Sequence, residues 1–215
     1  MKTAGKIASV GLAASLNQVA MMAVQITMNN GVKKYGAMAE YGSEIPLAAV
    51  GAITKVQVLF LSVILGISQG CQPIISFNYG AEDYARVRKA FKTALTAILF
   101  ASVFSWLCYQ IFPKPIMMLF GSNGELYLKF AVRYLRIYLF MTFVSGLQPF
   151  ATYFFTSIGK SWKGTLLTLM RQLALLVPLM LILPMFSGID GLMYAGPIAD
   201  GCAAALAVTL VVTEL

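Results

Sequence analysis

Histidine is absent from the 215 residues, and only 11% of them are charged. Soluble domains carry roughly a quarter charged residues, so this composition predicts an integral membrane protein. Without histidine, the chain lacks the most common metal ligand and the most common general base of enzymes. Since the acidic residues are also few, we expect no enzyme active site, no metal centre and no cofactor.

Cysteine is equally scarce, and each of its three positions stands alone. Cys71, Cys108 and Cys202 lie in apolar stretches far apart in the chain. This placement predicts small hydrophobic side chains and argues against a disulfide or metal framework. We also find no long linker, low-complexity tract, clear internal repeat or signal peptide, so a separate soluble domain is not expected.

Apolar sequence is abundant, at 59% of the residues. A helix needs about 20 apolar residues to cross a bilayer, so six spans would nearly use up the chain. We therefore expect an all-α integral membrane protein, with residues 1–215 forming a single transmembrane lobe. The expected spans cover about residues 7–29, 45–77, 90–112, 137–158, 165–185 and 192–212.

The net charge of +8 raises the question of nucleic acid binding. The basic residues gather at the ends of the expected spans, which favours the bilayer surface instead. One side holds the N-terminus and the turns at 78–92 and 159–164, with Lys2, Lys6, Arg86, Arg88, Lys89, Lys92, Lys160 and Lys163. By the positive-inside rule this side is cytoplasmic, and an even number of spans places both termini there.

Amide side chains form polar stripes inside the expected spans, where an unpaired amide is costly. Gln18, Gln25 and Asn29 share one face of the first span, where they would either bond to other helices or line a cavity. Gln69 belongs to a polar and small stripe in the second span, and Gln148 lies beside a similar stripe in the fourth. We treat Gln18, Gln25, Gln69 and Gln148 as candidate cavity residues.

Three charged residues are also candidates because they lie within expected spans. Lys55 either faces a cavity or extends its long side chain to the outer interface. Arg171 and Asp200 lie on consecutive antiparallel spans, and a rise of about 1.5 Å per residue places them at levels roughly 7 Å apart. We expect them to form an ion pair or share a hydrated pocket; the alternative is that Arg171 reaches the cytoplasmic edge and Asp200 bonds locally near Pro197.

Several segments of the sequence, taken in their order along the chain, resemble segments of a known protein family. They are Gln18 to Gly36, Lys55 with Gln57, Gly66 to Lys92, Leu119-Phe-Gly, Tyr134-Leu-Arg, Gln148 to Lys160, Arg171-Gln with Pro178, and Gly191 to Asp200. Together they resemble the C-terminal six-helix lobe of multidrug and toxic compound extrusion (MATE) transporters, and the bacterial drug-efflux branch most of all. The resemblance covers essentially the whole chain.

The resemblance implies a function that the chain would share with a partner. Such transporters have twelve helices in two lobes and move substrates by alternating access. They export amphipathic organic cations in exchange for protons or sodium ions, here across the bacterial inner membrane. The missing partner would be a complementary N-terminal six-helix lobe, or a second copy of this chain.

One departure from the family pattern limits this expectation. The resemblance implies that key coupling acids lie in the first lobe. In this sequence, Asp200 is the one acidic residue expected within a membrane span. The chain is therefore expected to be incomplete on its own. Alternatives are a lipid-linked saccharide flippase, whose cavity would need more cations than Lys55 and Arg171, and a non-transporting remnant that only associates with a partner lobe.

Overall fold

The chain forms helices joined by short turns throughout the part that the structure describes. A computed structural model describes residues 2–121 and 124–214, and of residues 2–14 it describes the helix but not the side chains. The elements are α1 (Lys2–Ala37), α2 (Glu44–Gly80), α3 (Tyr84–Ile111), α4 (Pro113–Met118), α5 (Glu125–Tyr138), α6 (Thr142–Ser145), α7 (Leu147–Ser157), α8 (Ser161–Leu169), the π-helical segment η1 (Met170–Leu176), α9 (Val177–Ser187) and α10 (Ile189–Val212). The predicted all-α class is confirmed.

Four of the described helices are long and apolar enough to cross a bilayer. They are α2, α3, the continuous run of α8, η1 and α9, and α10. A fifth is added if α5 and the following α6 and α7 are counted as one bent span. Helix α1 covers the first predicted span, 7–29, but the side chains of 2–14 lie outside the described residues. The count of six spans therefore stays a prediction.

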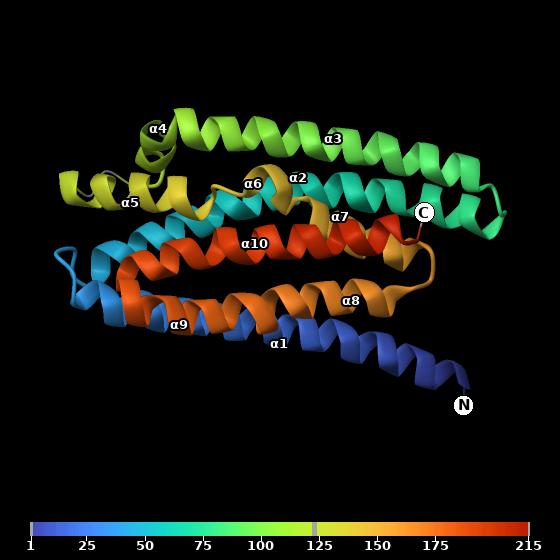
Figure 1. Cartoon of the computed structure of the whole chain (residues 1–215), viewed down its shortest axis with the longest axis horizontal. Coiled ribbons are helices and arrows are strands. Elements are labelled where there is room, and N and C mark those ends of the chain that lie inside the picture. Colours follow the sequence, from blue (N-terminus) through green and yellow to red (C-terminus); the bar gives the residue numbers. More distant parts are fainter. Residues whose placement is uncertain (1, 122–123, 215) are drawn as a thin grey trace.

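The helices lie side by side along the long axis of the molecule (Figure 1). The α1–α2 and α9–α10 turns gather at one end together with α4 and α5. The α2–α3 and α7–α8 turns, the start of α1 and the end of α10 lie at the opposite end. Fully buried side chains between the helices form the core, among them Ile64, Ile98, Phe130, Tyr134 and Leu192.

The turn between α2 and α3 shows why the chain reverses direction after Gly80. Glu82 adopts a left-handed backbone with φ of 60°. The Asp83 carboxylate accepts a hydrogen bond from the Arg86 backbone amide at 3.1 Å, which caps the N-terminus of α3. The two helices then run antiparallel in direct contact, and the basic residues of this turn lie at the end of the bundle.

The fourth predicted span, 137–158, differs from a continuous helix. Its segments meet at a bend of 45° after Tyr138. Just beyond, the Leu139 carbonyl accepts from both the Thr142 hydroxyl at 2.6 Å and the Thr142 backbone amide at 3.2 Å. At Gly146 a Cβ atom would lie 2.8 Å from the Ser102 Oγ atom, so glycine allows α3 to approach closely. The bend is therefore held by local bonds and by packing.

The fifth predicted span contains the π-helical segment η1, which the sequence analysis did not anticipate. The segment ends two residues before Pro178. Proline has no amide hydrogen and its ring conflicts with the carbonyl four residues earlier, here that of Ala174. Widening the helix just before the proline relieves this conflict, and π-helical turns of this kind often mark functional positions. Arg171 lies in this segment.

Ion pairs join neighbouring helices at both ends of the bundle. At the end that carries α5, Arg133 donates to Asp190 at 2.7 Å and Lys129 contacts Glu40 at 3.4 Å. At the opposite end, Lys160 and Lys163 both bind the Glu214 carboxylate, the second at 2.5 Å. Hydrogen bonds from these two lysines lower the pKa of Glu214 below its ordinary value. The chain after α10 is thus fastened to the α7–α8 turn.

Candidate functional site

An ion pair between Arg171 and Asp200 lies within the apolar part of the bundle. The Arg171 Nε atom donates to Asp200 Oδ1 at 2.8 Å, and Nη2 donates to the same oxygen at 2.5 Å. The Asp200 side chain is 7% exposed and that of Arg171 is 22% exposed. The predicted contact is confirmed. Because removing ions from water is costly, each charge depends on the other for its stability there.

The helix turn before Asp200 is shaped to bring an aromatic ring close to this pair. A Cβ atom at Gly196 would lie 2.6 Å from Cε2 of Tyr138, so only glycine leaves room for the ring. Tyr138 stacks on Tyr134 with ring centroids 5.3 Å apart. The contact at Gly196 lies one helical turn before Asp200 on α10. Tyr138 ends α5 and therefore links the bend of the fourth span to the ion pair.

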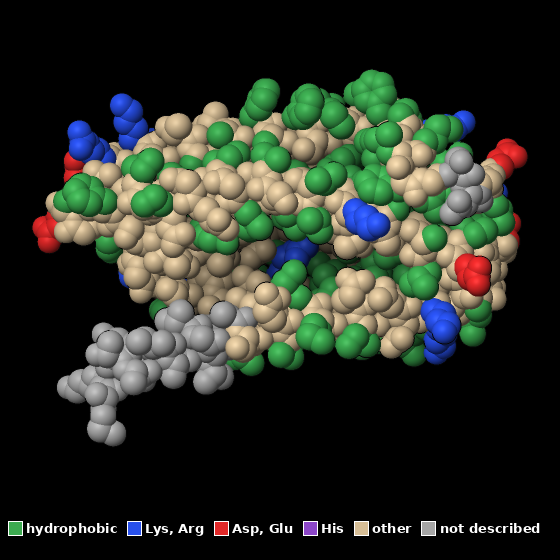
Figure 2. Space-filling view, turned by 180° about the vertical axis from the view of Figure 1, so that it is seen from behind, with side chains coloured by type: hydrophobic (Ala, Val, Ile, Leu, Met, Phe, Trp, Pro, Cys, Tyr) green, Lys and Arg blue, Asp and Glu red, His purple; other side chains and the backbone are tan. Residues whose placement is uncertain are grey.

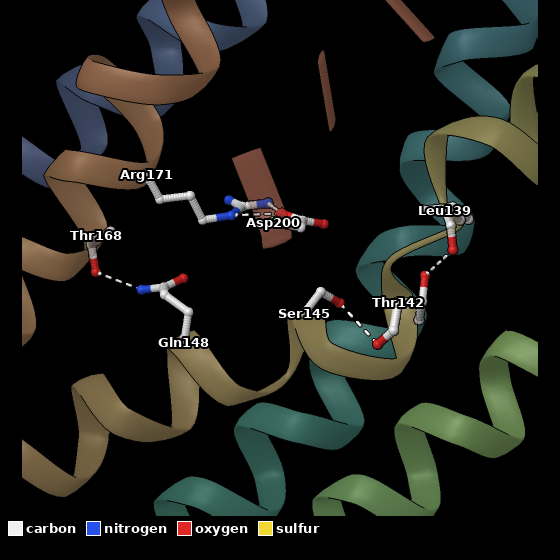
Figure 3. Close-up of polar contacts among 7 residues, drawn as sticks. All are labelled: Leu139, Thr142, Ser145, Gln148, Thr168, Arg171 and Asp200. Carbon is white, nitrogen blue, oxygen red and sulfur yellow. Dashed lines mark hydrogen bonds and ion pairs between the residues drawn. The ribbon is translucent and has the colours of Figure 1, made fainter. Parts of the chain in front are cut away.

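A second polar group lies next to the ion pair. The Gln148 side chain on α7 donates to the Thr152 hydroxyl at 3.2 Å and to the Thr168 hydroxyl on α8 at 3.3 Å. In Figure 3 the Gln148 side chain extends from α7 toward the space where Arg171 and Asp200 meet. Gln148 is buried, so its amide bonds to α8 satisfy a group that would otherwise be costly.

The Gln148 side chain thus fastens α7 to α8, while Arg171 and Asp200 fasten η1 to α10. We call Tyr138, Gln148, Thr168, Arg171 and Asp200 the polar cluster. Figure 2 shows that one side of the molecule is hollowed at mid-length, with a basic side chain visible inside the hollow and apolar side chains around it.

The other predicted site residues lie apart from the polar cluster, on the surface of the bundle. Gln18, Gln25, Lys55 and Gln69 are all exposed. Gln25 donates to Asn29 on its own helix at 3.1 Å, and Gln69 donates to the Tyr153 hydroxyl on α7 at 3.0 Å. The structure therefore unites Gln148, Arg171 and Asp200 but not the remaining four, whose role as cavity residues stays a prediction.

Three residues of the site were missed or not singled out in the sequence. Tyr138 and Gly196 are in contact because α5 ends at Tyr138, and no local sequence pattern predicts that helix end. The signal available was the Gly-Pro-Ile-Ala-Asp segment, which places a glycine one helical turn before the embedded acid. Thr168 precedes Arg171 by three positions, so the two share one face of the helix.

The polar cluster offers binding chemistry and no catalytic constellation. Over residues 2–121 and 124–214, no three His, Cys, Asp or Glu side chains come close enough together to hold a metal ion. The one acid of the cluster is occupied by Arg171, and the remaining members are neutral hydrogen-bonding groups.

Comparison with known proteins gives two curated relatives that are longer than this chain. The FAD transporter of Shewanella oneidensis is 24% identical over 168 residues, which cover 76% of this chain and 36% of the relative. The multidrug export protein MepA of Staphylococcus haemolyticus is 21% identical over 208 residues, 96% of this chain and 43% of the relative. The chain thus spans less than half the length of either relative.

The structure of the MATE multidrug transporter DinF-BH matches the whole fold. This chain is 27% identical to it and superposes with a TM-score of 0.85, covering 100% of this chain and 46% of that one. The MatE family model matches residues 13–182, well over half of the sequence. The chain therefore belongs to the MATE family of membrane transporters and has the fold of one transporter lobe.

Proposed function

We propose that this chain is the C-terminal half of a secondary active multidrug antiporter that exports amphipathic organic cations. The observation that carries the proposal is the Arg171–Asp200 pair, a buried carboxylate held by a cation within the bundle. A cationic substrate or a proton would compete with Arg171 for this carboxylate. Export would be driven by exchange for protons or sodium ions.

The partner in this proposal is a complementary N-terminal six-helix lobe or a second copy of the chain. Gln18, Gln25, Lys55 and Gln69 lie exposed on the bundle, where hydrocarbon around their polar groups would be costly. A partner lobe would cover this surface and complete a cavity between the two halves. These four residues, with Gln148, Arg171 and Asp200, are the proposed cavity residues.

A lipid-linked saccharide flippase is the second candidate from the same superfamily. Such a cavity needs positive charge toward the anionic phosphates of its substrate. Here Arg171 is already paired with Asp200, which leaves Lys55 as the other embedded cation considered. The polar cluster therefore favours a cationic substrate. The remaining alternative is a remnant that only associates with a partner lobe. It differs from both transporter candidates because it would move no substrate.

A chimera tests the proposed export. The half of DinF-BH that matches this chain is replaced by residues 1–215 and expressed in bacteria without their own drug pumps. We expect these cells to accumulate less ethidium, an amphipathic cation, than cells with the other half of DinF-BH alone. Collapsing the proton and sodium gradients should remove the difference. A chimera that assembles in the membrane yet leaves ethidium accumulation unchanged contradicts the proposal.

The proposed orientation places the chain in the bacterial inner membrane with both termini in the cytoplasm. Glu44, at the start of α2, and Ser161, at the start of α8, are exposed at opposite ends of the bundle. In a background without the native cysteines, Glu44→Cys should react with a membrane-impermeant maleimide added to intact cells. Ser161→Cys should react only after the membrane is opened, and the reverse pattern would show the opposite orientation.

A further inference from the structure

A groove runs along the contact between α2 and α3, apart from the polar cluster. Its volume is about 550 Å³, and its apolar walls include Gly70, Cys71, Ala94 and Ala97. Small side chains from both helices thus leave a channel open on the surface. The Cys71 thiol donates to the Ala90 carbonyl at 3.7 Å, so the two helices are in contact beneath the channel.

The two ends of this groove differ in charge. Arg86 and Lys89 line it in the first turns of α3, next to the turn between the two helices. Arg86 also contacts Asp83 at 3.6 Å, while no ion pair of Lys89 is found in the part of the chain that the structure describes. The groove is therefore basic where it meets the end of the bundle and apolar along the rest of its length.

The polar groups along the groove are bonded within their own helices. The Asn78 side chain donates to the Ile74 carbonyl at 2.8 Å, and the Thr93 hydroxyl donates to the Lys89 carbonyl at 2.9 Å. The groove thus requires no polar partner beyond its basic end. An occupant that fits it has an apolar body and a negative charge at one end.

The length of the groove agrees with one leaflet of a bilayer. On α3 it extends from Arg86 to Ala97, and on α2 from Ile67 to Asn78. At about 1.5 Å per residue each side measures roughly 16 Å. The hydrocarbon core is about 30 Å thick, so the groove reaches from the surface to near the middle of the membrane. A phospholipid acyl chain spans the same depth.

We propose that the α2–α3 groove binds an anionic phospholipid, with an acyl chain along the small residues and the phosphate beside Arg86 and Lys89. Basic pockets between transmembrane helices are a known means of holding anionic lipid head groups. The site lies outside the polar cluster and does not depend on drug export. Bound lipid would fill the channel and brace the α2–α3 hairpin.

Native mass spectrometry of the purified chain in detergent micelles tests the charge requirement. Dioleoylphosphatidylglycerol should bind more tightly than dioleoylphosphatidylcholine. Lys89→Gln should weaken the affinity for phosphatidylglycerol about fivefold, which is the effect of one cation near an anionic lipid. Lys92→Gln removes the same charge one helical turn away, outside the groove, and should leave the affinity unchanged. Equal effects of the two variants, or no preference for phosphatidylglycerol, overturn the proposal.

A pair of glycine variants tests the place of the acyl chain. A Cβ atom at either Gly66 or Gly70 would meet nothing within 4 Å, so both positions have room for a side chain. Gly70→Leu should fill the groove and abolish retention of the first bound lipid, while Gly66→Leu, one turn away, should retain it. If Gly70→Leu binds phosphatidylglycerol as the unchanged chain does, the lipid lies elsewhere.

The reactivity of a cysteine in the groove distinguishes bound lipid from a bound free anion and from loss of the fold. With Cys108 and Cys202 replaced by serine, phosphatidylglycerol should slow the reaction of Cys71 with N-ethylmaleimide, because the acyl chain covers that thiol. Inorganic phosphate should give no such protection. Protection by phosphate alone would mean that the basic end binds an anion without lipid, and unchanged reactivity with lipid would show an empty groove.

Discussion

Reversing the charge of either Arg171 or Asp200 is expected to destabilise the lobe strongly. Each single change, Arg171→Asp or Asp200→Arg, leaves two like charges together where an opposite pair now lies at 2.5 Å. Removing one partner of a buried ion pair costs about 3–5 kcal/mol. This is a large part of a typical folding stability of about 5–15 kcal/mol. Thermal unfolding in detergent micelles, followed by size-exclusion chromatography, measures the loss.

The double variant Arg171→Asp with Asp200→Arg separates a direct pair from two independent charges. It restores opposite charges across η1 and α10, so it should recover part of the stability that each single variant loses. A matched control is Glu40→Gln, which breaks the exposed Lys129–Glu40 pair and should cost about 0–1 kcal/mol. If the double variant is no more stable than the worse single variant, the coupling between the two residues is refuted.

The second large effect expected is a complete loss of gradient-driven export when this chain acts alone. A single lobe encloses no cavity between halves, and it exposes Gln18, Gln25 and Gln69 to hydrocarbon. Amide groups are costly in lipid unless a partner satisfies them, so the lobe should associate with a complementary lobe or a second copy. Proteoliposomes that contain only this chain should therefore show no ethidium uptake driven by a proton or sodium gradient.

Two further measurements on these proteoliposomes provide a positive control for transport and the number of associated chains. Full-length DinF-BH serves as the positive control for vesicle integrity and for the imposed gradient. Cross-linking or single-molecule photobleaching reports how many copies associate. Gradient-driven uptake by a chain shown to be a monomer would contradict the need for a partner, whereas uptake by a pair of chains would identify the second copy as that partner.

The fold class and part of the site could be predicted because both depend on properties that act along the chain. Long apolar runs and basic turns indicate membrane helices. The Arg171–Asp200 contact followed from the short turn at Gly188, because a tight reversal fixes the relative levels of residues on two antiparallel helices. An arginine side chain is long enough to close the remaining offset.

The other parts of the site depend on contacts between distant segments. The bend after Tyr138 has no proline at its position; the Thr142 bond lies beside it, and the close approach of α3 at Gly146 lies further along the same span. The closeness of Tyr138 to Gly196 is likewise a tertiary contact. For Gln18, Gln25 and Lys55, the sequence indicated that they are unsuited to lipid, and in the structure they lie exposed on the bundle.

The π-helical segment η1 sets the rotational phase between the two halves of the fifth helix. An α-helix advances about 100° per residue, so one additional residue in a widened turn offsets α9 relative to α8 by about that angle. Thr168 and Arg171 face the polar cluster, whereas Met180, beyond the segment, is buried and lines a pocket beside α1. The helix therefore carries polar side chains before Pro178 and apolar side chains after it without a break, since α8, η1 and α9 form one continuous run.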